Sequence, residues 1–232
     1  MADSFQFIYF VFQSTFNMDQ EKDYLKDITA IRSMMERSSR FISLSGLSGV
    51  FAGIVALIGA GVAYGYLGEK LSVRYSSDPN YYELVRYVSH RDIYILTLIG
   101  ILVLVSALLG GYYFTARKAK RQGVKTWDKT AKKLVSSMFI PLFTGGLFCL
   151  ALLYHGQIGL IAPATLVFYG LALLSGGQHT YKDIRYLGFF QVALGLISCF
   201  FVGYGLLFWS VGFGILHIIY GIVMYYKYDL KA

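Results

Sequence analysis

Charged residues are scarce in this 232-residue chain, and the scarcity is concentrated in four long stretches. Only 15% of the residues are Asp, Glu, Lys or Arg, against about 25% in an ordinary soluble domain. No charged residue occurs in residues 41–68, 93–116, 134–181 or 186–226. A helix needs about 20 largely apolar residues to cross a bilayer, so the shorter two stretches accommodate one span each and the longer two a hairpin each. The sequence therefore predicts an all-α, polytopic transmembrane helix bundle with six spans.

The limits of the spans follow from polar residues and glycines. We expect spans at about residues 41–67, 92–115, 134–154, 157–175, 184–205 and 209–227. The break in the third stretch is placed at Tyr-His-Gly-Gln, residues 154–157, because glycine suits a tight turn. The break in the fourth is placed near Trp209, because tryptophan prefers the membrane interface. An alternative reading of residues 186–226 is one span and a re-entrant segment.

Lysine and arginine are scarce in every second loop. Segments that would share one side of the membrane hold 17 of them, and the other side holds 4. Since positively charged loops stay in the cytoplasm, both termini are expected inside, with an outer loop at residues 69–91 and a basic cytoplasmic loop at residues 117–133. The net charge of +8 is explained in this way, and no nucleic-acid partner is expected.

Two segments outside the spans are expected to be helical. Residues 1–40 form a cytoplasmic N-terminal segment whose part from residue 18 to 40 is amphipathic, with Tyr24, Ile28, Ile31 and Met35 at helical spacing. In the outer loop, Asp78 followed by Pro79 is typical of a helix start. The apolar part of residues 1–17 is too short to span and has no basic flank, so it indicates either an interfacial segment or a true start at Met18.

Motifs for catalysis and for metal binding are also lacking. The two cysteines, Cys149 and Cys199, fall inside predicted spans and show no metal-binding or redox spacing. The sequence has no G-x-S-x-G, no H-E-x-x-H and no phosphate-binding loop. The remaining histidines lie away from the depth of His217, so no haem is expected. His90 and His155 could meet in the outer loops, but two histidines without a fixed spacing are a weak signal, so no metal is expected. We predict a protein without enzymatic activity and without a cofactor.

One side chain that titrates near neutral pH, His217, lies well inside a predicted span. Such residues are costly in hydrocarbon and are candidates for function by default. Gln191, Tyr169 and Tyr220 lie in spans that could bring them within hydrogen-bonding reach. Two interpretations remain open, namely a neutral histidine satisfied by these neighbours, or a ligand or proton site formed with them.

The basic loop combines positive charge with an aromatic residue that prefers the interface. This combination suits anionic lipid headgroups, and it could equally dock an acidic protein partner. The residues expected to contact headgroups are Arg117, Lys118, Lys120, Arg121, Lys125 and Trp127.

Small residues recur at helical spacing on three spans. In a bilayer, helices associate by close backbone packing, which small residues permit. These faces predict either packing within the chain or the interface of a homo-oligomer. The residues are Ser45, Gly49, Ala52 and Ala56 in the first span, Gly195 and Gly203 in the fifth, and Gly214 and Gly221 in the sixth.

The stretch IRSMMERSSRFISLSGLSGVFAG, residues 31–53, resembles the start of an uncharacterised family of bacterial inner-membrane proteins with about six spans. The resemblance implies a bacterial origin and the cytoplasmic membrane, and it carries no site residues. The leader at residues 1–17 departs from the family pattern and favours the start at Met18. We expect an accessory, sensor or scaffold component of the membrane, or alternatively a small-solute transporter or channel with a pathway near His217.

Overall fold

The structure is a computed structural model that describes Ile28 and residues 44–75, 89–123 and 127–230. The chain divides into two units, residues 1–40 and 41–232. The helices below belong to the second unit. Apart from Ile28, the predicted helix at residues 18–40 and the leader lie outside the described residues. The same is true of the predicted helix that starts after Asp78, and of the single residue Lys125.

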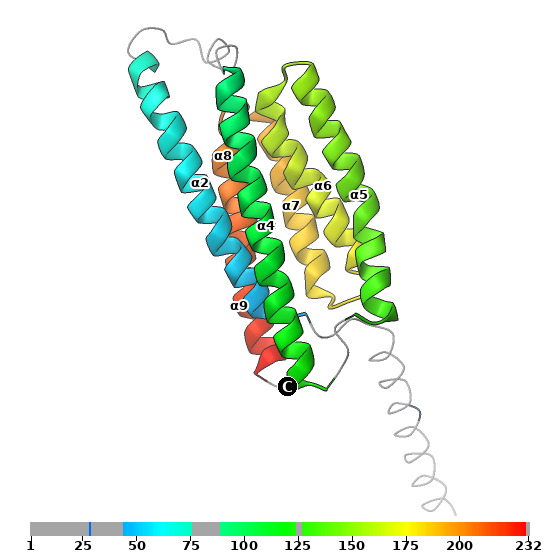
Figure 1. Ribbon diagram of the computed structural model, residues 1–232. Coiled ribbons are helices and arrows are strands. Elements are labelled where there is room, and N and C mark those ends of the chain that lie inside the picture. Colours follow the sequence, from blue (N-terminus) through cyan, green and yellow to red (C-terminus); the bar gives the residue numbers. More distant parts are fainter. Residues whose placement is uncertain (1–27, 29–43, 76–88, 124–126, 231–232) are drawn as a thin grey trace, which may run out of the picture. The chain divides into compact units, whose positions relative to one another are not determined.

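Six helices in the described part are long and apolar enough to cross a membrane, which confirms the predicted fold class (Figure 1). No strand occurs among the described residues. The elements are α2 (Gly46–Tyr75), α4 (His90–Arg121), α5 (Lys129–Tyr154), α6 (Ile161–Gly176) after the 3₁₀ turn η1 (Ile158–Leu160), α7 (Asp183–Phe200), and a sixth helix made of α8 (Gly205–Trp209), η2 (Ser210–Leu216), α9 (His217–Met224) and η3 (Tyr225–Asp229).

Glycines with positive φ make the turns of both hairpins. Gly156, with φ 70°, follows the end of α5 at Tyr154, where the sequence predicted a break. Gly203, with φ 112°, lies between α7 and α8, so residues 186–226 hold two helices and the re-entrant alternative is wrong. The fifth span ends at Phe200 rather than residue 205, and Gly203 belongs to the turn instead of a helix-packing face.

The basic loop is shorter than predicted, because helices take up both of its ends. The helix α4 continues to Arg121, so the first four basic residues lie on its last two turns. The helix α5 starts at Lys129, and the Asp128 carboxylate accepts a hydrogen bond from the Ala131 backbone N–H at 2.6 Å. Such N-capping stabilises the first turn of a helix.

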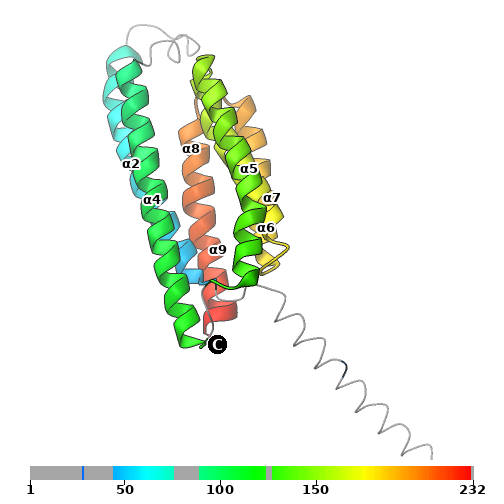
Figure 2. The same cartoon turned by 45° about the vertical axis from the view of Figure 1, so that its right-hand side comes forward.

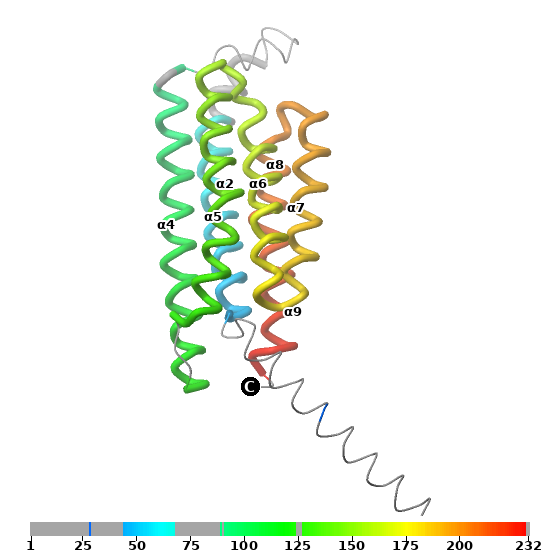
Figure 3. The backbone as a smooth tube through the Cα atoms, turned by 90° about the vertical axis from the view of Figure 1, so that its right-hand side faces the viewer, coloured from blue at the N-terminus to red at the C-terminus, as the bar shows by residue number. Residues whose placement is uncertain are grey.

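The helices of this unit form two neighbouring groups. The helices α5, α6 and α7 pack against one another in sequence, and α2 packs against α4 and against the sixth helix (Figures 2 and 3). The sixth helix also contacts α6 and α7, so it joins the groups. One end of the bundle contains the start of α2 and Asp229, and we call it the Asp229 end; the opposite end contains Tyr154.

Glycines let α2 and the sixth helix approach backbone to backbone. A Cβ atom at Gly221 would collide with the Val50 backbone nitrogen and would lie 2.7 Å from the Gly46 carbonyl oxygen. A Cβ atom at Gly49 would lie 3.1 Å from the Gly221 Cα. A Cβ atom at Gly214 would collide with the Leu57 side chain. These contacts are within the chain, which is one of the two uses predicted for these small residues.

A second close approach joins α6 to α7. A Cβ atom at Gly195 would lie 2.7 Å from Val167 Cγ2, and one at Gly188 would lie 2.9 Å from the Gly170 carbonyl oxygen.

On α2, Ala56 is buried and Ala52 is half-buried. Two glycines in the second half of α2, Gly61 and Gly65, have no neighbour within 4 Å of an added Cβ atom, so α2 uses only the glycines of its first half for packing within the described bundle.

The helix α4 lies at the margin of the bundle. None of the residues in its apolar window is buried within the described part of the chain. Its main packing partner is α2, where Val103 lies against Gly59 and the Tyr66 hydroxyl donates to Asp92 Oδ1 at 2.7 Å. Most of its apolar surface is therefore left to lipid or to another membrane protein.

Candidate functional site

The sixth helix departs from regular α-helix geometry just before His217. Residues Ser210–Leu216 form a π-helical segment, and such segments are common at functional sites. Within it, a Cβ atom at Gly212 would collide with Leu166 Cδ2 and would lie 2.7 Å from Gln191 Oε1. Glycine at this position therefore allows α6 and the Gln191 side chain of α7 to approach the backbone of the sixth helix.

Both ring nitrogens of His217 are occupied by groups of the chain itself. Nδ1 lies 3.0 Å from the Gly212 carbonyl oxygen, and Nε2 lies 2.9 Å from the Tyr169 hydroxyl. A carbonyl oxygen only accepts, so Nδ1 carries the proton; Nε2 of the neutral ring then accepts a hydrogen bond from Tyr169. The side chain of His217 is 6% exposed. In a neutral imidazole, these partners select the tautomer that carries its proton on Nδ1.

Gln191 completes the group around the Gly212 carbonyl. Its Nε2 donates to that carbonyl oxygen at 2.8 Å and lies 3.4 Å from His217 Nδ1. Because both nitrogens are donors aimed at the same oxygen, the 3.4 Å approach adds no further hydrogen bond. The Gln191 side chain is fully buried, and its Oε1 has no hydrogen-bond partner in the described part of the chain.

Aromatic rings enclose the imidazole on the side of α6 and η2. The ring centroids of Tyr169 and Phe213 lie 5.4 Å and 5.8 Å from that of His217, and Phe213 stacks nearly parallel to it. Tyr220 follows one turn later and packs with Tyr169 against the cluster of Leu173, Ile184 and Leu187. The Tyr220 hydroxyl is buried and has no hydrogen-bond partner in the described structure. The structure thus brings Tyr169 and Gln191 to His217, and it leaves Tyr220 nearby.

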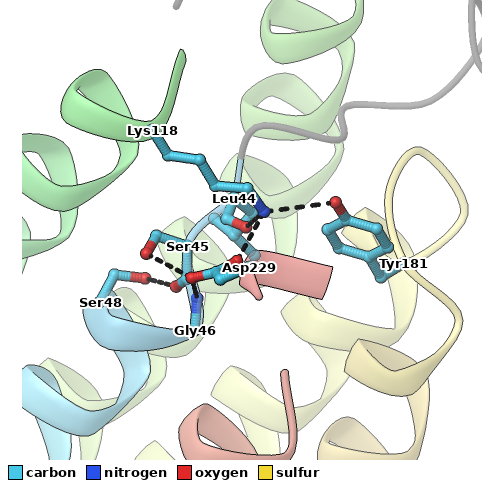
Figure 4. A network of polar contacts seen from close by, with 7 residues as sticks. All are labelled: Leu44, Ser45, Gly46, Ser48, Lys118, Tyr181 and Asp229. Carbon is cyan, nitrogen blue, oxygen red and sulfur yellow. Dashed lines mark hydrogen bonds and ion pairs between the residues drawn. The ribbon is translucent and has the colours of Figure 1, made fainter. Parts of the chain in front are cut away.

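A second polar cluster closes the Asp229 end, and we call it the charged clamp (Figure 4). Lys118 Nζ lies 2.7 Å from Asp229 Oδ1, 2.9 Å from the Leu44 carbonyl oxygen and 3.5 Å from the Tyr181 hydroxyl. The side chains of Lys118 and Asp229 are 8% and 9% exposed. Because its buried ammonium binds Asp229 and the Leu44 carbonyl, Lys118 does not reach a lipid headgroup in this structure, which corrects the prediction for this residue.

Asp229 also serves as a remote cap for the first helix. Its Oδ2 accepts hydrogen bonds from the Gly46 backbone N–H at 3.0 Å and from Ser45 Oγ at 2.9 Å. A carboxylate at a helix N-terminus and a lysine in the last turn of α4 both complement the helix dipoles. Sequence reasoning missed Asp229, because its partners lie far away in the chain and an aspartate near a chain end carries no pattern.

The aromatic residue Tyr181 connects the charged clamp with a more exposed ion pair, which Lys227 and Asp183 form. Burial, together with the negative charge of Asp229, raises the pKa of Tyr181 to about 12, so its hydroxyl stays protonated at neutral pH. Its ring stacks on Tyr228 with centroids 4.0 Å apart. The Tyr228 hydroxyl donates to Asp183 Oδ2 at 2.6 Å, and Lys227 Nζ lies 2.8 Å from the same oxygen.

The other residues predicted to contact lipid headgroups are exposed where the structure describes them. They lie on the last turns of α4 and just before α5. Their positions suit a membrane surface at the Asp229 end. The exposed members are Arg117, Lys120, Arg121 and Trp127.

No protein-family model, no curated protein and no solved structure matches this chain. Within the described residues, no group of three or more His, Cys, Asp or Glu side chains is placed to hold a metal ion. The interpretation of function therefore depends on the geometry of the two polar clusters and of the exposed helix α4.

Proposed function

We propose that this chain is a non-enzymatic accessory, sensor or scaffold component of the bacterial cytoplasmic membrane, with both termini in the cytoplasm. One observation carries the proposal: α4 is long and apolar enough to cross a membrane, and none of the residues in its apolar window is buried within the described part of the chain. A span whose apolar window is left exposed by its own chain is suited to contact another membrane protein. In this orientation the exposed Arg117, Lys120 and Arg121 face the anionic cytoplasmic leaflet.

The state of His217 supports the same proposal. Ion and solute pathways in membranes are lined by polar groups that face a water-filled cavity. Here the imidazole is buried, and both of its nitrogens are bound by Gly212 and Tyr169. The ring has no free nitrogen to offer to a passing solute.

Photocrosslinking from α4 tests the proposal in native membranes. A photoreactive amino acid in place of Leu102 or Leu109, both exposed, is expected to give discrete adducts with a second protein or a second copy of the chain. The same residue at Ala56, which is buried in α2, is the control and is expected to react only within the chain. If α4 gives adducts with lipid alone, an accessory or scaffold role that uses this helix is refuted.

A small-solute transporter or channel is the second candidate. The observation that favours it is that some buried oxygens have no hydrogen-bond partner in the described structure, among them Gln191 Oε1 and Tyr220 Oη, near a π-helical segment. Unpaired buried polar atoms are rare, and they commonly indicate a bound water, an ion or a ligand. This candidate requires a pathway for water at the depth of His217.

A further inference from the structure

The sixth helix contains a segment whose geometry is not the one that a backbone adopts by itself. Residues Ser210–Leu216 are π-helical, and π-helices are rare in proteins and occur mostly as short insertions in α-helices. Such a segment persists where contacts from outside its backbone stabilise it. The Gly212 carbonyl lies inside the segment and accepts hydrogen bonds from two side chains, from Gln191 Nε2 at 2.8 Å and from His217 Nδ1 at 3.0 Å.

The hydrogen bond from His217 fits π-helical geometry and does not fit an α-helix. His217 follows Gly212 by five residues. In an α-helix, residues five apart point about 140° away from each other, and residues three or four apart are neighbours instead. In a π-helix the backbone hydrogen bond itself spans five residues, so residue i+5 lies beside the carbonyl of residue i. An α-helical segment would therefore carry the imidazole away from the Gly212 carbonyl.

The helices α6 and α7 hold the two donors in place. The Tyr169 hydroxyl of α6 binds the other ring nitrogen of His217 at 2.9 Å, and Gln191 is a fully buried residue of α7. The missing side chain of Gly212 admits both helices, because a Cβ atom there would collide with Leu166 of α6 and would lie 2.7 Å from Gln191 Oε1. Polar contacts from three helices thus meet at one carbonyl group.

The two halves of the sixth helix, on either side of this segment, are held differently (Figure 2). After the segment, α9 packs backbone to backbone on α2, where a Cβ atom at Gly221 would lie 2.7 Å from the Gly46 carbonyl oxygen. Before the segment, α8 has five residues and follows the turn at Gly203. Its only buried residue is Gly205, and its Leu207 side chain is 57% exposed. A change of geometry within the segment would therefore turn α8 and leave α9 in place.

We propose that Gln191 and His217 form a latch that keeps Ser210–Leu216 π-helical, and that loss of both hydrogen bonds to Gly212 lets this segment return to an α-helix. The return turns α8 by about 100° relative to α9, which is the angle of one residue in an α-helix. The turn changes the surface at the Tyr154 end while α2 and α9 stay together. Two such arrangements are the two-state element that a sensor requires, and in this use the latch rests on the proposed sensor role.

Pulsed EPR on the full chain in lipid nanodiscs tests the latch through the distance between two spin labels. The two native cysteines are replaced by alanine, and labels are attached to cysteines in place of Tyr94 on α4 and Leu207 on α8, which are both exposed. With the latch intact, this pair is expected to give one main distance. Gln191→Leu together with His217→Phe removes both donors, and it is expected to add a second distance that differs by up to about 8 Å, because the label is carried on the surface of a turning helix.

Three controls accompany the double variant. Each single variant removes one donor and is expected to show the second distance in a smaller proportion, so the test does not depend on the folding of the double variant. Tyr220→Phe removes a buried hydroxyl that has no hydrogen-bond partner in the described structure, and it is expected to keep the wild-type distance. A second label pair, at the exposed Tyr112 of α4 and Ile222 of α9, is expected to keep its distance in every variant.

Two results would overturn the latch. One is an unchanged distance between positions 94 and 207 in the single and double variants. The other is an equal shift of the pair at positions 112 and 222, which would show a loosened bundle rather than a turn of α8. Failure of the α4 crosslinks would refute the accessory role and leave the EPR result untouched, because the distances are measured on the isolated chain.

Discussion

Replacement of Asp229 by alanine is expected to lower the free energy of unfolding by about 3 kcal/mol or more. The substitution leaves the Lys118 ammonium buried without its counter-ion, and it removes the acceptor of the Gly46 N–H at the start of α2. Loss of one partner of a buried pair is costly, because the remaining charge has neither water nor a partner. Denaturant or thermal unfolding of the purified protein in mild detergent measures the change.

Two further variants separate the ion pair from other effects of residue 229. Lys227→Met breaks the exposed pair with Asp183, and it is expected to cost no more than about 1 kcal/mol. The double variant Lys118→Met/Asp229→Leu removes both buried charges, and it is expected to recover much of the lost stability. If Asp229→Ala proves as mild as Lys227→Met, the charged clamp does not hold the end of the bundle.

Replacement of Gly221 by alanine is expected to cost about 3 kcal/mol. The added methyl would collide with the Val50 backbone nitrogen and approach the Gly46 carbonyl oxygen, and backbone atoms cannot turn aside as a flexible side chain can. The helices α2 and α9 would have to separate along their line of contact. The unfolding free energy in detergent, measured at equal protein and detergent concentrations, reports the loss.

The matched control for this change lies on α2. Gly61→Ala adds the same methyl group inside a helix, at a position where nothing lies within 4 Å. It is expected to be neutral or to stabilise by up to about 1 kcal/mol, because alanine is the better helix former. Equal effects of the two substitutions would show that helix propensity, and not the crossing of α2 with α9, determines the cost at Gly221.

The sequence predicts the six spans because bilayer thickness and the cost of buried charge act on composition alone. Two long uncharged stretches could each be divided, and Gly156 identifies the first break within a residue or two. The second break is displaced from the predicted position, because Trp209 lies within the helical sixth span rather than at its edge. A single tryptophan is a weaker marker than a glycine at positive φ.

Contacts between distant residues were harder to predict than helices. The structure places Tyr169 and Gln191 beside His217, where the scarcity of polar residues in the spans had left few alternative partners. The charged clamp depends on the meeting of Lys118 and Asp229 after the bundle has closed, and no local pattern shows it. The π-helical segment Ser210–Leu216, which packs mainly against α2 and also contacts α7, was likewise not predicted, because its composition is that of an ordinary apolar helix.

The central claim is that the bundle is closed to water around His217. In a chain whose Cys149 and Cys199 are replaced by alanine, a single cysteine is placed at position 217, or at position 198 in place of the fully buried Ser198. A membrane-impermeant maleimide is applied to each side of sealed membranes, and a cysteine in place of the exposed Tyr154 is the positive control. We predict labelling at position 154 and none at positions 217 and 198; labelling of either buried cysteine from one side would contradict the closed bundle and favour a transport pathway.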